Sequence, residues 1–139
     1  MKFLAIYRAA ETEVPPTVEH MAAMGKLIQE MSEKGILIAT EGCLPSKLGA
    51  RLRRSNEKIT VTDGPFTESK EVVGGFALMR CNSKEEAIEW TRKFLEVAGD
   101  GESEIRQIYE PADSGDAIPA DLKEQDKRSR ARMAGYSSR

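Results

Sequence analysis

Asp63 and His20 are the two side chains of this 139-residue chain whose types and positions suit acid–base chemistry. Asp63 ends a predicted strand, residues 58–63, whose isoleucine and valine alternate with threonines, so its carboxylate should share their half-buried side. A carboxylate in a cleft is partly desolvated and can serve as a general acid or base. The alternative is a turn role, because aspartate before Gly64-Pro65 can accept backbone N–H groups. The residue pattern leaves both interpretations open.

His20 is the only histidine and lies near the start of a predicted helix, residues 17–34, on its apolar side. If His20 and Asp63 met, the carboxylate could orient the imidazole as a base. The alternative is a histidine packed against Met24 and the sheet with one ring nitrogen hydrogen-bonded. A lone histidine is a weak signal for catalysis.

Further polar and aromatic residues could line a ligand cleft. The loop after Asp63 carries an aromatic and two charged side chains, although the aromatic could equally be a hydrophobic plug and the charges could face solvent. An arginine in the last strand could bind a carboxylate or pair with a neighbouring glutamate, either Glu104 or Glu41. A tyrosine in the first strand should point into the interior, where its hydroxyl needs a partner. The candidate ligand-binding residues are Tyr7, Glu41, Phe66, Glu68, Lys70 and Arg106.

The sequence predicts neither a metal site nor a cofactor site. Cys43 and Cys81 lack metal-ligand spacing, and one histidine cannot complete a Cys/His zinc set. We expect both cysteines to be reduced and half-buried. Gly74-Gly75 lies at the start of the predicted strand 72–81, where it predicts a bulge or a close backbone approach. Because no helix follows it directly, it lacks the context of a phosphate-binding loop.

Composition and charge limit the classes of partner that the chain could bind. The formal charge is −2 and only 6% of residues are aromatic, so neither a basic field nor a stacking platform favours nucleic acid. No segment approaches the apolar length that spans a bilayer, and the first residues read as a strand rather than a leader. We therefore expect a cytoplasmic protein without membrane contact.

Hydrophobic periodicity predicts two β-α-β halves separated by a β-hairpin. The predicted strands are residues 2–7, 36–40, 48–54, 58–63, 72–81 and 104–109, and the predicted helices are residues 17–34 and 83–97. This order indicates an α+β fold, a ferredoxin-like antiparallel sheet with two helices on one face plus a β-hairpin insertion.

Two helices cover only one face of such a sheet. Alternation assigns five residues to the face away from the helices, and an exposed apolar sheet face is an interaction surface. These are Phe3, Ala5, Tyr7, Ala77 and Met79. Pairing two such faces about a two-fold axis predicts a homodimer. Residues 111–139 form a charged tail outside the 1–110 domain, either disordered or packed on the partner subunit.

The stretch VTDGPFTESKE, residues 61–71, followed by Val72-Val73-Gly74-Gly75-Phe76, resembles the signature of the DGPF branch of YCII-like proteins. Flanking segments resemble the same branch: residues 41–46 after the second strand, 83–87 at the second helix, and 104–106 in the last strand. The resemblance covers residues 1 to about 110.

This resemblance implies a dimeric α/β barrel with a polar cleft in each subunit. In the wider group, a histidine near the start of the first helix and an aspartate are thought to form a catalytic pair, which would correspond to His20 and Asp63 here. The function we expect is binding of a small polar ligand with cofactor-free acid–base chemistry. The alternative is a non-catalytic dimeric regulatory or protein-interaction module.

Overall fold

A computed structural model describes residues 1–66 and 72–136 of the chain. The chain divides into two compact units, Met1–Ile108 and the residues from Tyr109 onward. Each unit is described by itself.

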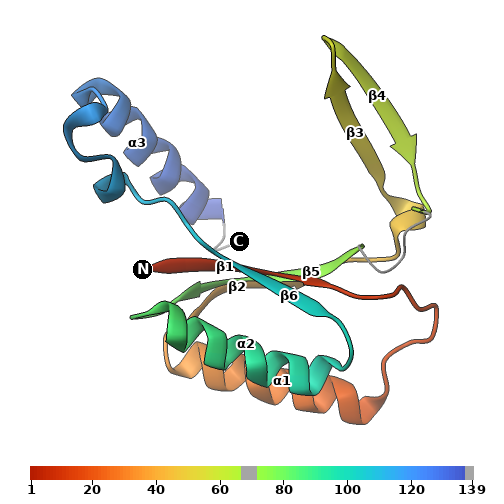
Figure 1. The fold of residues 1–139 in the computed structure, drawn as a ribbon. Helices are drawn as coiled ribbons and strands as arrows, with labels where there is room; N and C mark the ends of the chain where they lie inside the picture. Colours follow the sequence, from red (N-terminus) through yellow and green to blue (C-terminus); the bar gives the residue numbers. More distant parts are fainter. Residues whose placement is uncertain (67–71, 137–139) are drawn as a thin grey trace. The chain divides into compact units, whose positions relative to one another are not determined.

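The first unit contains a four-stranded antiparallel sheet with strand order β2-β5-β1-β6. Both of its helices lie on the same side of this sheet (Figure 1). Its elements are β1 (Lys2–Arg8), α1 (Val18–Glu33), β2 (Leu37–Gly42), the 3₁₀ turn η1 (Ser46–Leu48), β3 (Ala50–Ser55), β4 (Lys58–Asp63), β5 (Val73–Arg80), α2 (Lys84–Ala98) and β6 (Glu102–Gln107). The predicted α+β fold, with an antiparallel sheet and helices, is confirmed.

Local side chains fix where the two helices begin. The Thr17 hydroxyl accepts the backbone N–H of His20 at 3.1 Å, and the Ser83 hydroxyl accepts that of Glu86 at 3.1 Å. These side-chain oxygens satisfy N–H groups that have no partner within the first helical turn. Gly35, just after α1, has a φ of +68°, the left-handed conformation that ends helices at low cost.

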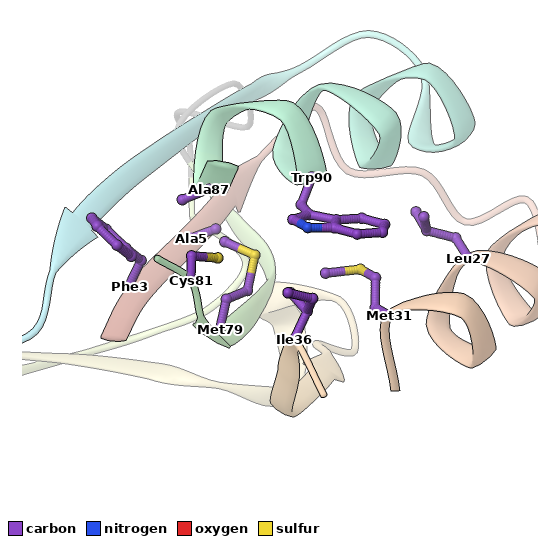
Figure 2. Packing of buried hydrophobic residues seen from close by; sticks show 9 residues of the cluster. All are labelled: Phe3, Ala5, Leu27, Met31, Ile36, Met79, Cys81, Ala87 and Trp90. Carbon is purple, nitrogen blue, oxygen red and sulfur yellow. The ribbon is translucent and has the colours of Figure 1, made fainter. Parts of the chain in front are cut away.

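The main core lies between the helices and the sheet, and it corrects our assignment of the two sheet faces. Phe3, Ala5 and Met79 are buried under the helices, not on the opposite face as predicted. Figure 2 shows them with the rest of the buried cluster, which also contains Leu27, Met31, Ile36, Cys81, Ala87 and Trp90. The prediction failed because both alternating sets of these strands are apolar, so period 2 alone could not tell which set the helices cover.

The face away from the helices is still apolar, but different residues form it. Leu4 lies opposite Leu78 and Ile6 lies opposite Phe76 in the β1–β5 register. Because directly opposite residues share a face, these four side chains form one patch. Ala39, exposed on neighbouring β2, lies opposite Leu78 and extends the patch. We call these five residues the open-face patch.

The burial of several other residues also differs from expectation. Met21 and Ile88, which helical periodicity assigns to the apolar sides of the predicted helices 17–34 and 83–97, are exposed, whereas Trp90 is buried. Cys81 is buried as a core residue, but Cys43 is exposed in the segment after β2, which corrects the prediction that both cysteines are half-buried.

Strands β3 and β4 form a separate two-stranded sheet (Figure 1). Every residue from Ala50 to Asp63 is exposed. The half-buried character predicted for residues 58–63 is therefore wrong, because no other helix or sheet of the first unit covers either face of the hairpin. Asn56 and Glu57 connect the strands with φ values of 50° and 65°, as a two-residue hairpin turn requires.

The second unit consists of a 3₁₀ segment, Pro111–Ala117, and the helix α3, Ala120–Tyr136. Ion pairs one turn apart support α3: Arg128 lies 3.4 Å from Glu124, and Arg130 lies 2.7 Å from Asp126. Residues 120–136 are thus helical, where the sequence left disorder as one alternative. Packing of this segment on a partner subunit stays a prediction. No helix within the described residues is long and apolar enough to cross a membrane.

Candidate functional site

A cavity of about 540 Å³ lies between the helices and the sheet of the first unit. Its wall is mostly apolar and comes from α1, α2 and the facing strands. Six polar residues contribute to this wall: Tyr7, His20, Thr40, Glu41, Thr91 and Ser103. The volume lies in the range of pockets that hold small organic ligands.

Small residues on the two central strands create this space. Ala5 lies opposite Ala77, and Tyr7 lies opposite Gly75, in the β1–β5 register. Protein cores are normally filled to near crystal density, so a floor of alanine and glycine under two helices leaves room that larger side chains would occupy. Both alanines line the cavity.

Gly75 also allows two strands to approach closely. A Cβ atom at this position would lie 2.8 Å from the Glu41 backbone oxygen on β2. The register of β1 with β5 shifts between Tyr7 and Arg8, opposite Gly74. The bulge or close backbone approach predicted for Gly74-Gly75 is confirmed.

Tyr7 lies on the helix side of the sheet, which corrects its predicted position in a barrel interior. Its hydroxyl donates to the Asp100 backbone oxygen at 3.0 Å, and its ring meets the Phe94 ring edge-to-face at 5.2 Å. A Cβ atom at Gly101 would lie 2.5 Å from the Tyr7 ring, so glycine lets the backbone pass against it. Burial, and then the Asp100 carboxylate, raise the pKa of Tyr7 above its ordinary value.

His20 is half-buried in the first turn of α1, and its side chain lines the cavity. Among the described residues, none hydrogen-bonds its imidazole ring. The hydroxyls of Thr40 and Thr91 instead donate to the backbone oxygens of Phe76 and Ala87, at 2.9 and 2.8 Å. His20 is therefore a titratable side chain of the wall that a ligand could engage, whereas exposed Glu41 lies opposite Phe76 and shares its face of the sheet.

The remaining predicted site residues lie elsewhere. Asp63 is exposed at the end of β4 opposite Ala50 and does not line the cavity, so this chain alone does not bring it to His20. Arg106 is exposed and lies 3.9 Å from Glu104, the pairing that we considered as its non-functional role. Glu68 and Lys70 lie outside the described residues.

Phe66 belongs to a junction at the base of the hairpin. Its backbone N–H donates to the Ser46 hydroxyl at 3.1 Å, and the Ser46 hydroxyl donates to a Glu11 carboxylate oxygen at 2.7 Å. The Ser46 backbone N–H donates to the other carboxylate oxygen. These two hydrogen bonds, first from the hydroxyl and then from the backbone, lower the pKa of Glu11 below its ordinary value. The guanidinium of Arg51 stacks over the Phe66 ring at 4.1 Å.

Gly64 explains part of the DGPF motif physically. A Cβ atom at Gly64 would lie 1.7 Å from the Ser46 backbone oxygen, a distance that no side chain could accept. The Gly64 N–H donates to the Gly49 oxygen at 3.0 Å, and the bond to Pro65 is cis. The motif thus ties the chain after β4 to the turn before β3.

Sequence reasoning missed Ser46, Glu11 and Trp90. Trp90 lines the cavity and follows Ala87 at the helical spacing of the inner face, a signal that would have identified it. No local pattern marks Glu11 and Ser46, which are 35 residues apart. The described residues contain no group of three or more His, Cys, Asp or Glu side chains arranged to hold a metal ion.

The fold and cavity define a small α+β domain with a mostly apolar site that a histidine helps to line. The family model of the YCII-related domain matches residues 1–111, and the chain belongs to this family. The match does not separate the DGPF branch from other members, so that assignment stays a prediction.

One relative is an uncharacterized protein of Rhizobium meliloti (strain 1021), 34% identical over 84 residues, which cover 58% of this chain and 68% of that protein. A solved structure, 5-chloro-2-hydroxyhydroquinone dehydrochlorinase from Burkholderia phenoliruptrix AC1100 in complex with 2,5-dihydroxybenzoquinone, is 15% identical with a TM-score of 0.44. That match covers 81% of this chain and 97% of the other. A likeness at this level says nothing about the chemistry of this chain.

Proposed function

We propose that the protein binds a small molecule in the cavity above Ala5 and Ala77. The observation that carries this proposal is a space of about 540 Å³ bounded by an apolar wall and reached by His20. The ligand should have a largely apolar body and one or two hydrogen-bonding groups. This revises the polar ligand expected from the sequence, because the wall offers few polar partners.

Acid–base chemistry at this site would rest on His20. An imidazole that no described residue hydrogen-bonds can accept or donate a proton to a bound molecule. The pair of His20 with Asp63 gains no support from this chain, since Asp63 does not line the cavity. We therefore propose ligand binding as the primary function and treat catalysis as a property to be tested on a bound ligand.

The open-face patch supports a homodimer, which we propose as the assembly in which the ligand is bound. Leu4, Ile6, Ala39, Phe76 and Leu78 give one face of the sheet an apolar surface that no helix of the first unit covers. Apposing two such faces about a two-fold axis would produce a dimeric α/β barrel from two ferredoxin-like halves. The same patch also favours the alternative function, a non-catalytic interaction module.

Fluorine NMR tests the ligand proposal with 4-fluorophenol and fluorobenzene as probes. Exchange with the cavity should broaden their signals saturably, and Ala77→Leu should abolish the broadening because the added carbons occupy the floor. Ala23→Leu makes the same change at an exposed position of α1 that does not line the cavity, so it should bind like the wild type. Equal broadening in both variants, or none in the wild type, would contradict the proposal.

A further inference from the structure

The hairpin β3–β4 carries an exposed apolar stripe on one of its faces. Leu52 lies directly opposite Val61. Ile59, two residues before Val61 on β4, lies on the same face. Their exposed fractions are 69%, 61% and 64%. A two-stranded hairpin with no layer on either face is at best marginally stable in water, so this stripe needs a surface to cover it.

Hydrogen bonds fix the base of this hairpin, whereas both of its strands are exposed. The Ser46 hydroxyl links Glu11, before α1, to the backbone of Phe66, and Gly64 donates to Gly49 across the base. Arg51 adds its contact with the Phe66 ring. An arm anchored at one end and uncovered along its length presents the stripe in a defined direction, at a reduced entropic cost of docking.

The charge distribution identifies the kind of surface that the hairpin fits. Residues 50–63 carry four basic and two acidic side chains, whereas the rest of residues 1–108 carry eleven basic and fifteen acidic ones. A basic arm and an acidic body on the same chain are complementary between two copies of it. The acidic body of a second copy therefore offers negative charge to the basic hairpin.

We propose that the hairpin of one copy packs its Leu52, Ile59 and Val61 stripe on the body of a second copy. This inference rests on the homodimer proposed above. Two-fold symmetry makes the contact reciprocal, so the hairpin of each subunit packs on the body of the other. We call this reciprocal hairpin contact the clasp. The stripe then supplies apolar contact area in addition to the open-face patch, and the anchor at Ser46 holds each arm in place.

Sedimentation equilibrium on three variants separates the hairpin contact from the dimer itself. Leu52→Thr with Val61→Thr keeps β-forming residues but removes the stripe, and it should raise the dimer Kd at least tenfold. Thr60→Ser with Thr62→Ser alters the other face of the hairpin and should leave the Kd within about twofold. Ile6→Thr with Phe76→Thr, in the open-face patch, should dissociate the dimer.

Each outcome bears on a different proposal. A monomeric wild type would overturn both the dimer and the clasp. A dimer that the open-face variant dissociates, but that keeps its Kd in Leu52→Thr with Val61→Thr, would overturn the clasp alone. Amine cross-linking of the unmodified protein, mixed as ¹⁴N and ¹⁵N chains, gives an independent measurement. Cross-links from Lys58 should join chains of different isotope, and cross-links confined to single chains would contradict the clasp.

Discussion

Substitution of Gly64 by alanine tests the account of the hairpin base most sharply. The new Cβ would start 1.7 Å from the Ser46 oxygen, and real contacts stay beyond 3.0 Å, so the chain must move by at least about 1.3 Å. Such a shift breaks the hydrogen bonds from Gly64 to Gly49 and from Phe66 to Ser46, now 3.0 and 3.1 Å long. At roughly 0.5–1.5 kcal/mol each, their loss should destabilise the junction by about 1–3 kcal/mol.

Hydrogen exchange of the Phe66 amide is the assay, because it reports opening of the junction rather than of the whole domain. Gly64→Ala should speed this exchange about 5- to 150-fold, the equivalent of that free energy. Gly49→Ala is the matched control: its Cβ would lie 3.6 Å from the same Ser46 oxygen, and its φ of −118° suits any residue. Equal exchange rates in the two variants would refute the close-approach argument.

Three further predictions follow from burial. Phe3→Ala should lower the free energy of unfolding by about 3–5 kcal/mol in urea titrations, because Phe3 is only 1% exposed; a loss below about 1.5 kcal/mol would contradict its place in the core. Cys43 should react with a thiol reagent at once, whereas Cys81, which is buried and whose pKa is raised mainly by burial, should react only on unfolding; equal rates would be inconsistent with the fold. For Tyr7, folding favours the neutral phenol, so its contribution to stability is complete below about pH 10 and is lost as the pH rises through its raised pKa. The melting temperature of Tyr7→Phe should therefore fall less steeply above pH 10 than that of the wild type. Parallel curves of melting temperature against pH would argue against the raised pKa of Tyr7.

Local chemistry made the elements predictable from sequence. The Thr17 and Ser83 caps, the glycine after α1 and the alternation of residues 58–63 each act within a few residues, so their signals are readable in a short window. The Gly74-Gly75 irregularity was readable for the same reason, because glycines inside a strand mark bulges.

A short sequence window could not show which face of the sheet the helices cover, nor where the cavity forms. Leu4 and Ile6 are as apolar as Phe3 and Ala5, so the pattern of β1 fits either orientation. The cavity depends on Ala5 lying opposite Ala77, a register between strands 72 residues apart that no local pattern specifies. The buried Ser46 with its Glu11 partner is likewise visible only once distant segments meet.

The candidate catalytic pair shows a third kind of limit. Sequence could identify Asp63 and His20 as residues able to do acid–base chemistry, but not whether they share a site. The structure places His20 at the cavity and Asp63 on an exposed hairpin. His20 and Tyr7 line the site because α1 and β1 bound it, whereas β4 belongs to a separate sheet.

The six methionines offer the most direct test of the cavity as a ligand site. Three line it, Met24, Met31 and Met79, and three do not, Met1, Met21 and Met133. In protein labelled with ¹³C at the methionine methyl groups, titration with 4-fluorophenol should shift the first three signals with a single saturable Kd and leave the others unchanged. Shifts confined to Met1, Met21 and Met133, or no saturable shift in the cavity set, would contradict the proposal that this space binds a small molecule.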